Sequence, residues 1–443
     1  MGQRKIFALT LAGKRVWSSV GDEVSESEVS SLTGLCTAVM GVCEQQGETI
    51  RSVSCGSGRI VCARRGELVF VAAGSSDCEA YLARELEYAY EAMLMALTSR
   101  VHKVLASSPG YDVKELLGST GTVLSSLEAW GRTRPEPFLG AARAARLEAS
   151  RRAQLAHVLA SARKISGDLL VFGVALCGDA VLSVLQPTPT IERRLRSTDL
   201  LLLANYVRSQ RAALVAAESS WLPLCLPRFD ERGYFHAFVA YLDPAVDLCL
   251  VLVAADDKPE TFATLRNVSK AIENALLRDG VLDALRDAAV EDYRAADRIA
   301  ETAKADHFIF SRRRPLAAQP PKEPRAELAL AQCLSARAVG THHWAHYHAL
   351  ALRLRCGSAQ PQHALATDPN TSAHDLFEAP LAASLVYATS NARTYFALTA
   401  PNFELYATFA SLAPASDLAK RTHHILSLIK LEEPAFFFDP VSY

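Results

Sequence analysis

The sequence lacks the cysteine spacing of a metal site: its ten cysteines include no Cys-x-x-Cys pair. No segment approaches the ~20 apolar residues that a membrane-spanning helix needs, and the N-terminus has no apolar stretch long enough for a signal peptide. The formal net charge is only −1, so no overall field attracts the chain to nucleic acid. We therefore expect a soluble, cytoplasmic protein that does not bind nucleic acid.

Motifs that carry chemistry are also missing. The chain contains no GxxxxGK[ST] or GxGxxG phosphate loop, no GxSxG nucleophile motif and no HExxH zinc motif. His342 and His346 are four residues apart and would share one helix face, but a closed zinc site needs about four ligands and no others follow at suitable spacing. We predict that the protein has no cofactor, no metal and no chemical active site, and is not an enzyme in that sense.

What the sequence does contain is a repeated order of elements. A hairpin over residues 5–20 is followed by a helix, three short β-rich runs and a long helix from about residue 77, in the order β-β-α-β-β-β-α. The same order recurs twice, the third time in degraded form. We predict an α/β protein of three consecutive modules, each an antiparallel five-stranded sheet flanked by helices, with domains at residues 1–130, 165–300 and 301–443.

The segments between these elements differ in composition. Residues 131–164 are rich in Ala and Arg and are predicted to form a charged helical linker. Residues 315–325 and 357–378 are rich in Pro or polar residues and are expected to be surface loops. In the third module we expect a helix between residues 327 and 355.

Two short basic clusters are candidates for contact with anionic lipid head groups, because each positive charge near such a membrane adds about 1 kcal/mol of attraction. A solvated surface is the commoner role of such short runs. The clusters consist of Arg193, Arg194 and Arg196, and of Arg312, Arg313 and Arg314.

Two tryptophans are candidates for a protein interface. Trp17 lies on the second predicted strand, and Trp221 opens the run "WLPLCLP" next to Pro223. Tryptophan is favoured at binding hot spots but is also common in cores. The sequence leaves both roles open.

Several strings resemble the vacuolar-fusion Mon family. They are "KIFALTLAGKRVWSSVGDE", "STDLLLLANYV", "AESSWLPLCLPRFDERGYFHAFVAYLD" and the C-terminal "LIKLEEPAFFFDPVSY". The element order is that of longin domains, so the resemblance implies three longin-type modules. The chain departs from the family pattern at Arg15, Trp17 and Val20, and it carries one extra serine before Trp221.

The resemblance implies a function without covalent chemistry. Such a chain is expected to pair with a Ccz-like longin subunit and to promote nucleotide exchange on a Rab GTPase of the Rab-seven (Ypt-seven) class. The pair would be recruited peripherally to anionic phosphoinositide membranes of late endosomes and vacuoles, in endosome maturation, membrane fusion and autophagy. The alternative is a longin-type adaptor or tethering subunit without exchange activity. The candidate interface residues are Trp17, Asp22, Glu23, Trp221 and Pro223.

Overall fold

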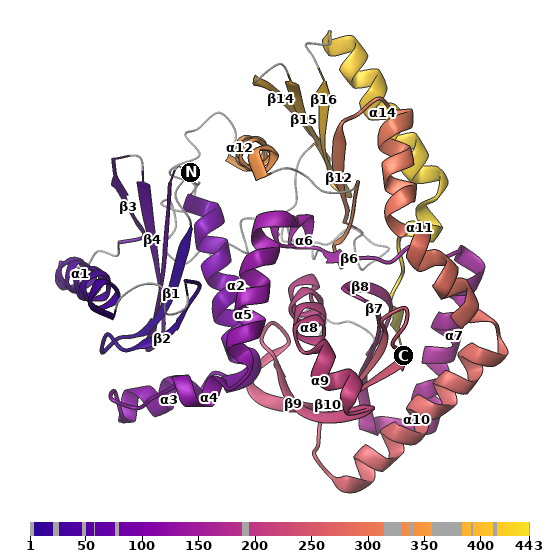
Figure 1. The fold of residues 1–443 in the computed structure, drawn as a ribbon, viewed down its shortest axis with the longest axis horizontal. Coiled ribbons are helices and arrows are strands. Elements are labelled where there is room, and N and C mark those ends of the chain that lie inside the picture. The colour runs from indigo at the N-terminus through magenta and orange to yellow at the C-terminus, as the bar shows by residue number, and fades with distance from the viewer. Residues whose placement is uncertain are drawn as a thin grey trace, which may run out of the picture.

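The chain folds into three sheets that follow one another in sequence (Figure 1). The structure is a computed structural model. It describes residues 4–442 except for 21–25, 47–49, 57, 76–78, 188–194, 314–329, 337–340, 357–382, 391–392 and 411–413. The segments predicted as loops, 315–325 and most of 357–378, lie outside the described residues. No helix in the described part of the chain has the length and apolar character required to cross a bilayer.

The first sheet has helices on both faces. Alternation along β1 (Lys5–Thr10) directs Ile6 and Ala8 toward α2 (Glu79–Leu97), and Phe7 and Leu9 toward α1 (Glu26–Gln45). The sheet has the order β2-β1-β5-β4-β3. Its other strands are β2 (Arg15–Ser18), β3 (Ser52–Cys55), β4 (Gly58–Arg65) and β5 (Leu68–Ser75). Four further helices follow: α3 (Arg100–Ser107), α4 (Lys114–Leu117), α5 (Thr120–Thr133) and α6 (Pro135–Leu139).

The second sheet is also covered on both sides. Helices α7 and α10 pack on one face, with Leu155 and Leu265 in a common core cluster, while α8 covers the other. The sheet has the order β17-β8-β7-β11-β10-β9. Its strands are β7 (Leu170–Cys177), β8 (Ala180–Gln186), β9 (Ser219–Leu226), β10 (Asp230–Asp243), β11 (Leu248–Ala254) and β17 (Val441–Ser442). Its helices are α7 (Ala149–Ser166), α8 (Ser197–Ser209), α9 (Arg211–Ala216), α10 (Pro259–Arg278) and α11 (Val281–Thr302).

The third sheet has the same strand order as the first two. Its order is β14-β15-β16-β12-β13-β6, in which β6 is an addition from outside the unit. When the five strands of each unit are numbered in chain order, all three sheets have the order 2-1-5-4-3, which in the third sheet runs from β13 to β14. Its strands are β12 (His307–Arg312), β13 (Gln332–Ser335), β14 (Ser384–Ser390), β15 (Arg393–Ala400), β16 (Phe403–Ala410) and the added β6 (Ala142–Arg143). Its helices are α12 (Thr341–Cys356), α14 (Ala415–Leu431) and α15 (Glu433–Phe436).

One prediction needs correction here. The segment 131–164 contains the predicted helix, as α7, but it is not a linker between units, because β6 adds to the third sheet and α7 is a core helix of the second unit. Its basic character was misleading: Arg152 is buried and donates hydrogen bonds to the carbonyls of Leu182 (2.8 Å) and Ala145 (2.6 Å). The helix expected between residues 327 and 355 is α12, and strand β13 precedes it within that range.

Candidate partner-binding surface

Few of the described side chains of helix α1 are buried against its sheet. Among its described side chains only Cys36 and Met40 are buried, whereas α2 buries fifteen of its nineteen residues. Cys36 and Met40 pack on side chains from β1, β4 and β5. The Cys62 thiol on β4 donates a hydrogen bond to Cys36 and so lowers the pKa of the Cys36 thiol. Among its described side chains, α1 therefore contributes only these two to the buried core.

The outward side of α1 is apolar and carries no charge. Leu35 and Val42 are 60% and 55% exposed and lie seven residues apart, on one side of the helix. Residues 29–43 contain no charged side chain, although the solvent-facing side of a helix normally carries charged or polar residues. A helix with this pattern is expected to be covered by another element.

Strand β3, at the edge of the sheet, carries a further exposed apolar side chain. Val53 is 40% exposed and lies opposite Ile60, which packs against the cluster beneath α1. Residues directly opposite on neighbouring strands have their side chains on the same face, so Val53 lies on the α1 side of the sheet. We call Leu35, Val42 and Val53 the α1–β3 surface.

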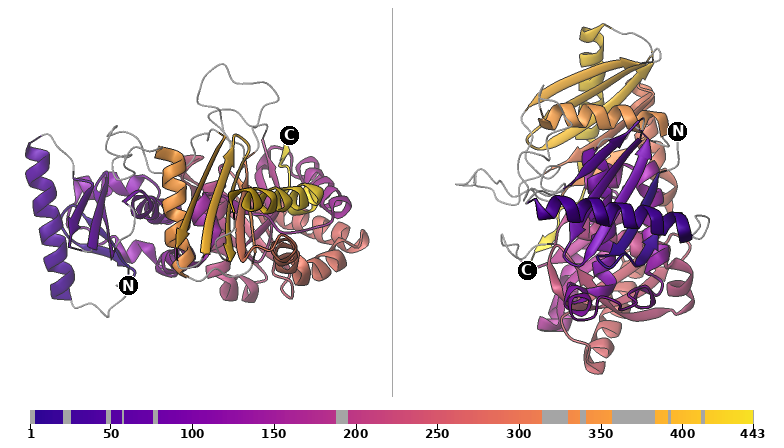
Figure 2. Two further views of the ribbon diagram at one scale, coloured as in Figure 1. Left: turned by 90° about the horizontal axis from the view of Figure 1, so that it is seen from above. Right: turned by 90° about the vertical axis from the view of Figure 1, so that its left-hand side faces the viewer.

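The corresponding helices of the other two units are covered by the chain itself. Helix α8 buries nine of its thirteen residues, and Asn205 donates a hydrogen bond to the Val123 carbonyl of α5 at 2.9 Å. In α12, His348 stacks on Tyr81 of α2 with ring centroids 3.5 Å apart. Helix α1 instead lies at one end of the molecule, with no described element beyond it (Figure 2). Of these three helices, α1 alone has an uncovered apolar side in the described structure.

None of the described residues predicted for the interface belongs to the α1–β3 surface. Trp17 is only 9% exposed and belongs to the core on the α2 side of the first sheet, which is the core role that the sequence had left open beside the interface role. It lines a small apolar cavity together with Tyr88 and Leu124. Asp22 and Glu23 lie outside the described residues. The signal that would have found the α1–β3 surface was the absence of charge from residues 29–43.

The side chain of Trp221 is partly packed in its own unit and partly exposed at the surface. It lies on β9, the edge strand of the second sheet, and is half-buried. Its ring stacks on His236, with centroids 5.6 Å apart, and meets the edge of Phe262 at 5.8 Å. Pro223, two residues further, is exposed. The packed side of Trp221 supports its own unit, and its contact with a Rab stays a prediction.

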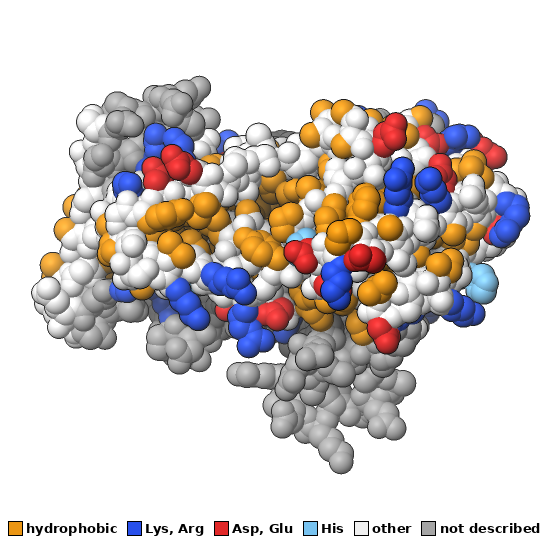
Figure 3. Space-filling view, turned by 90° about the horizontal axis from the view of Figure 1, so that it is seen from below, with side chains coloured by type: hydrophobic (Ala, Val, Ile, Leu, Met, Phe, Trp, Pro, Cys, Tyr) orange, Lys and Arg blue, Asp and Glu red, His pale blue; other side chains and the backbone are white. Residues whose placement is uncertain are grey.

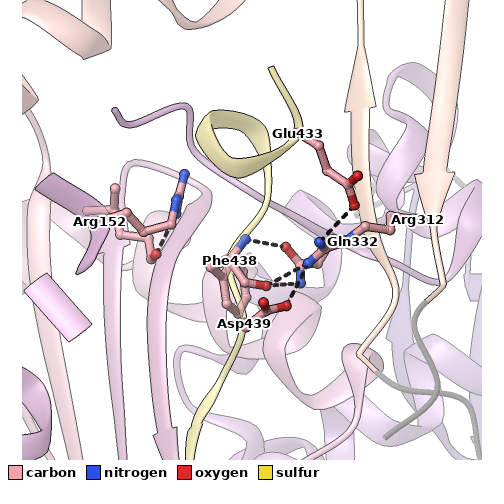
Figure 4. Close-up of polar contacts among 7 residues, drawn as sticks. Arg152, Arg312, Gln332, Glu433, Phe438 and Asp439 are labelled. Carbon is pink, nitrogen blue, oxygen red and sulfur yellow. Dashed lines mark hydrogen bonds and ion pairs between the residues drawn. The ribbon is translucent and has the colours of Figure 1, made fainter. Parts of the chain in front are cut away.

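The structure removes two arginines from the predicted lipid-binding set. Arg312 is 9% exposed and lies under the C-terminal tail (Figure 4). Its guanidinium donates a hydrogen bond to the Phe438 carbonyl (2.8 Å) and pairs with Glu433 and Asp439, both at 3.2 Å. Gln332 holds the same tail through both backbone groups of Phe438. Arg312 therefore joins the tail to the third sheet and does not face a membrane.

Arg313 is more deeply buried, at 3% exposure, and forms a close ion pair with the fully buried Glu404. Arg196 caps α8, where its backbone N–H donates to the Asp199 carboxylate at 3.3 Å. Arg193, Arg194 and Arg314 lie outside the described residues. Figure 3 views the molecule from below, and the basic side chains on that face are mixed with acidic and hydrophobic ones.

The histidine-rich helix α12 is a core element and not the polar surface that its composition suggests. Trp344 and Tyr347 are buried in an aromatic cluster, and His346 stacks on Tyr395 with centroids 4.1 Å apart. Burial lowers the pKa of His348 well below its usual value. Among the described residues, no three His, Cys, Asp or Glu side chains are grouped to hold a metal ion.

Family models match two of the three units. Residues 4–127 match the model described as the first longin domain of FUZ, MON1 and HPS1, and residues 169–272 match the second longin domain of the same proteins. The fold and these matches define a longin-domain protein, with antiparallel sheets flanked by helices.

Three similar proteins indicate which family of longin-domain proteins this chain belongs to. Vacuolar fusion protein MON1 homolog A from Gallus gallus is 32% identical over 290 residues, which are 65% of this chain and 50% of the relative. The homolog A from Homo sapiens is 31% identical over 312 residues, 70% of this chain and 45% of the relative. Protein SAND from Takifugu rubripes is 28% identical over 288 residues, 65% and 53% of the two chains. The chain belongs to the MON1 family, and it spans about half the length of these relatives.

Proposed function

We propose that this chain is one subunit of a heterodimeric guanine nucleotide exchange factor for a Rab GTPase of the Rab-seven class. Its partner would be a Ccz-like longin subunit, and the pair would act in transport to, and fusion at, late endosomes and vacuoles. The observation that carries the proposal is the α1–β3 surface in the first longin unit of a MON1-family chain. The names of the relatives, vacuolar fusion proteins, support the setting.

The chemistry of the surface indicates a protein partner that stays bound. Interface cores are depleted in charged residues relative to the rest of a protein surface, and α1 has none from residue 29 to 43. Gly34 and Gly41 lie beside Leu35 and Val42, and a Cβ added at either glycine would meet no atom within 4 Å. An element of the partner can therefore approach the α1 backbone closely and bury both apolar side chains.

Exchange needs no acid, base or metal from this chain. A Rab releases GDP when its switch regions are drawn away from the phosphates and Mg²⁺. A partner that binds the nucleotide-free state more tightly than the loaded states accelerates that release through differential binding alone. In this proposal the joined first units, with Trp221 and Pro223 nearby, form the Rab-binding side. Recruitment to an anionic phosphoinositide membrane would use basic side chains other than Arg312 and Arg313.

The test is co-expression with a Ccz-like subunit, followed by release of a fluorescent GDP analogue from the loaded Rab. Leu35→Glu and Val42→Glu should each reduce co-purification of the Ccz-like subunit at least tenfold, because a charge would be buried at the interface. Leu277→Glu is the matched control, since Leu277 on α10 is 54% exposed and lies in another unit. Unchanged co-purification of both α1 variants would refute the assignment of the surface.

The rate of GDP release is measured separately from formation of the complex. A complex that forms through α1 and speeds GDP release supports the full proposal. A complex that forms equally well but leaves the release rate unchanged, with every Rab of this class tried, would support the adaptor or tethering alternative instead.

A further inference from the structure

Strand β14 is a sheet edge with an exposed apolar side. It is the terminal strand of the third sheet and pairs with β15 along its whole length, from Ser384 opposite Thr399 to Ser390 opposite Arg393. Its side chains alternate between half-buried and exposed. Leu385 and Tyr387 are 50% and 53% exposed, while Val386 packs against the cluster beneath α12. The exposed set therefore lies on the face opposite α12.

The equivalent strand of the second unit shows what is missing at β14. Strand β9 is also the third strand of its unit and a sheet edge. Its Trp221 is covered by Phe262 of α10 at 5.8 Å between ring centroids. In the third unit Tyr387 lies opposite Phe396, which is only 3% exposed. On this face, the described structure therefore buries the side chain of Phe396 on β15 but leaves that of Tyr387 on β14 exposed.

Other edges of the three sheets are protected. Edges that display unpaired N–H and C=O groups bind further strands unless they are short, charged, broken by proline or covered. Strands β8 and β13 are each covered by a parallel two-residue strand of this chain, β17 and β6. Strand β9 contains Pro223, and β2 and β3 have only four residues each. Strand β14 has seven residues with no charge and no proline.

We infer that β14 is a second docking edge, which takes an extended strand from a partner chain with apolar residues at alternate positions. Only a strand satisfies a row of unpaired backbone groups and at the same time covers every second side chain. The chain uses the same mode internally, because β6 and β17 are extended segments added to sheet edges. The site lies on the third unit, away from the α1–β3 surface (Figure 1), and it does not depend on the proposed exchange activity.

The probe is a fluorescein-labelled peptide with the sequence of Arg393–Ala400, RTYFALTA. This is the strand whose alternation already fits β14, with Leu398 opposite Leu385. Fluorescence anisotropy is measured while the full chain is titrated into the peptide. We expect saturable binding that weakens at least tenfold with Leu385→Lys and Tyr387→Lys, because charges on an edge disfavour strand addition. Leu277→Lys, at a similarly exposed position on α10, should bind the peptide like the unmodified chain.

A second peptide keeps the test independent of how the variants fold. The same sequence with N-methylated amides retains every side chain but cannot donate backbone hydrogen bonds, and we expect its binding to be lost. Equal binding of the N-methylated peptide would overturn the proposal in favour of plain hydrophobic contact. Dimerisation of the chain that Tyr387→Lys abolishes would also overturn it, since the occupant would then be a second copy.

Discussion

Replacement of Arg313 by methionine should destabilise the third unit, although Arg313 stands in a run of three arginines that resembles a surface patch. Its side chain is 3% exposed and that of Glu404 is fully buried, and the two form a close ion pair. Removing one partner of a buried pair leaves an uncompensated charge and costs about 3–5 kcal/mol. Arg313→Met is therefore expected to lower the free energy of unfolding by roughly that amount.

The double variant Arg313→Met, Glu404→Gln provides the control. Glutamine removes the orphaned charge but keeps an oxygen that accepts the hydrogen bond from Tyr406, now 2.8 Å from Glu404. Replacing both members of a buried pair by neutral groups is often close to neutral. The double variant should therefore be more stable than Arg313→Met by about 2 kcal/mol or more.

Urea unfolding followed by circular dichroism and by limited proteolysis measures these differences. Flotation with anionic vesicles, corrected for folded protein, should be the same for all the variants. If Arg313→Met stays within about 0.5 kcal/mol of the unmodified chain, as surface substitutions usually do, and loses vesicle binding, the burial of this pair is refuted.

Three further outcomes follow from the packing. Phe438→Ala should cost about 3–5 kcal/mol of stability, because the side chain of Phe438, in the C-terminal tail, is buried in the core at 1% exposure; thermal unfolding measures this. Trp221→Ala should cost about 2 kcal/mol, since its ring is partly buried against His236 and Phe262, and any loss of Rab exchange beyond the loss of folded complex would show a direct contact. Burial raises the pKa of Asp199 to about 7, above that of an unfolded aspartate. Stability should thus rise by up to about 1.4 kcal/mol per unit as pH falls from 7 toward 4, relative to Asp199→Asn, in urea titrations.

The order of strands and helices was predictable because each unit follows local rules. The predicted hairpin begins with "KIFALT", which is strand β1, where Phe7 and Leu9 pack on one helix and Ile6 and Ala8 pack on another. The matches to two longin domains confirm the predicted fold of those units. Strand β13 was not predictable as a strand of this sheet, since its four residues are defined by pairing with β12 and β6.

The role of charged side chains was less predictable, because it depends on partners far along the chain. Arg312 and Arg313 are adjacent, yet one pairs with Glu433 and Asp439 in the tail and the other with Glu404 on β16. Nothing in the local run "SRRRP" reveals those partners. A short basic cluster therefore predicts a surface only when no distant acid is brought to it by the fold.

The first helices of the three units differ in composition and in the elements they contact. Helix α8 lies against α5 and is rich in leucine, with Leu200 to Leu203 all buried. Helix α12 lies against aromatic side chains of α2 and α6, and it is rich in Trp, Tyr and His. Helix α1 has small and apolar residues but no such neighbour among the residues that the structure describes. If each helix reflects what covers it, the uncharged composition of α1 is best explained by a cover that another chain supplies.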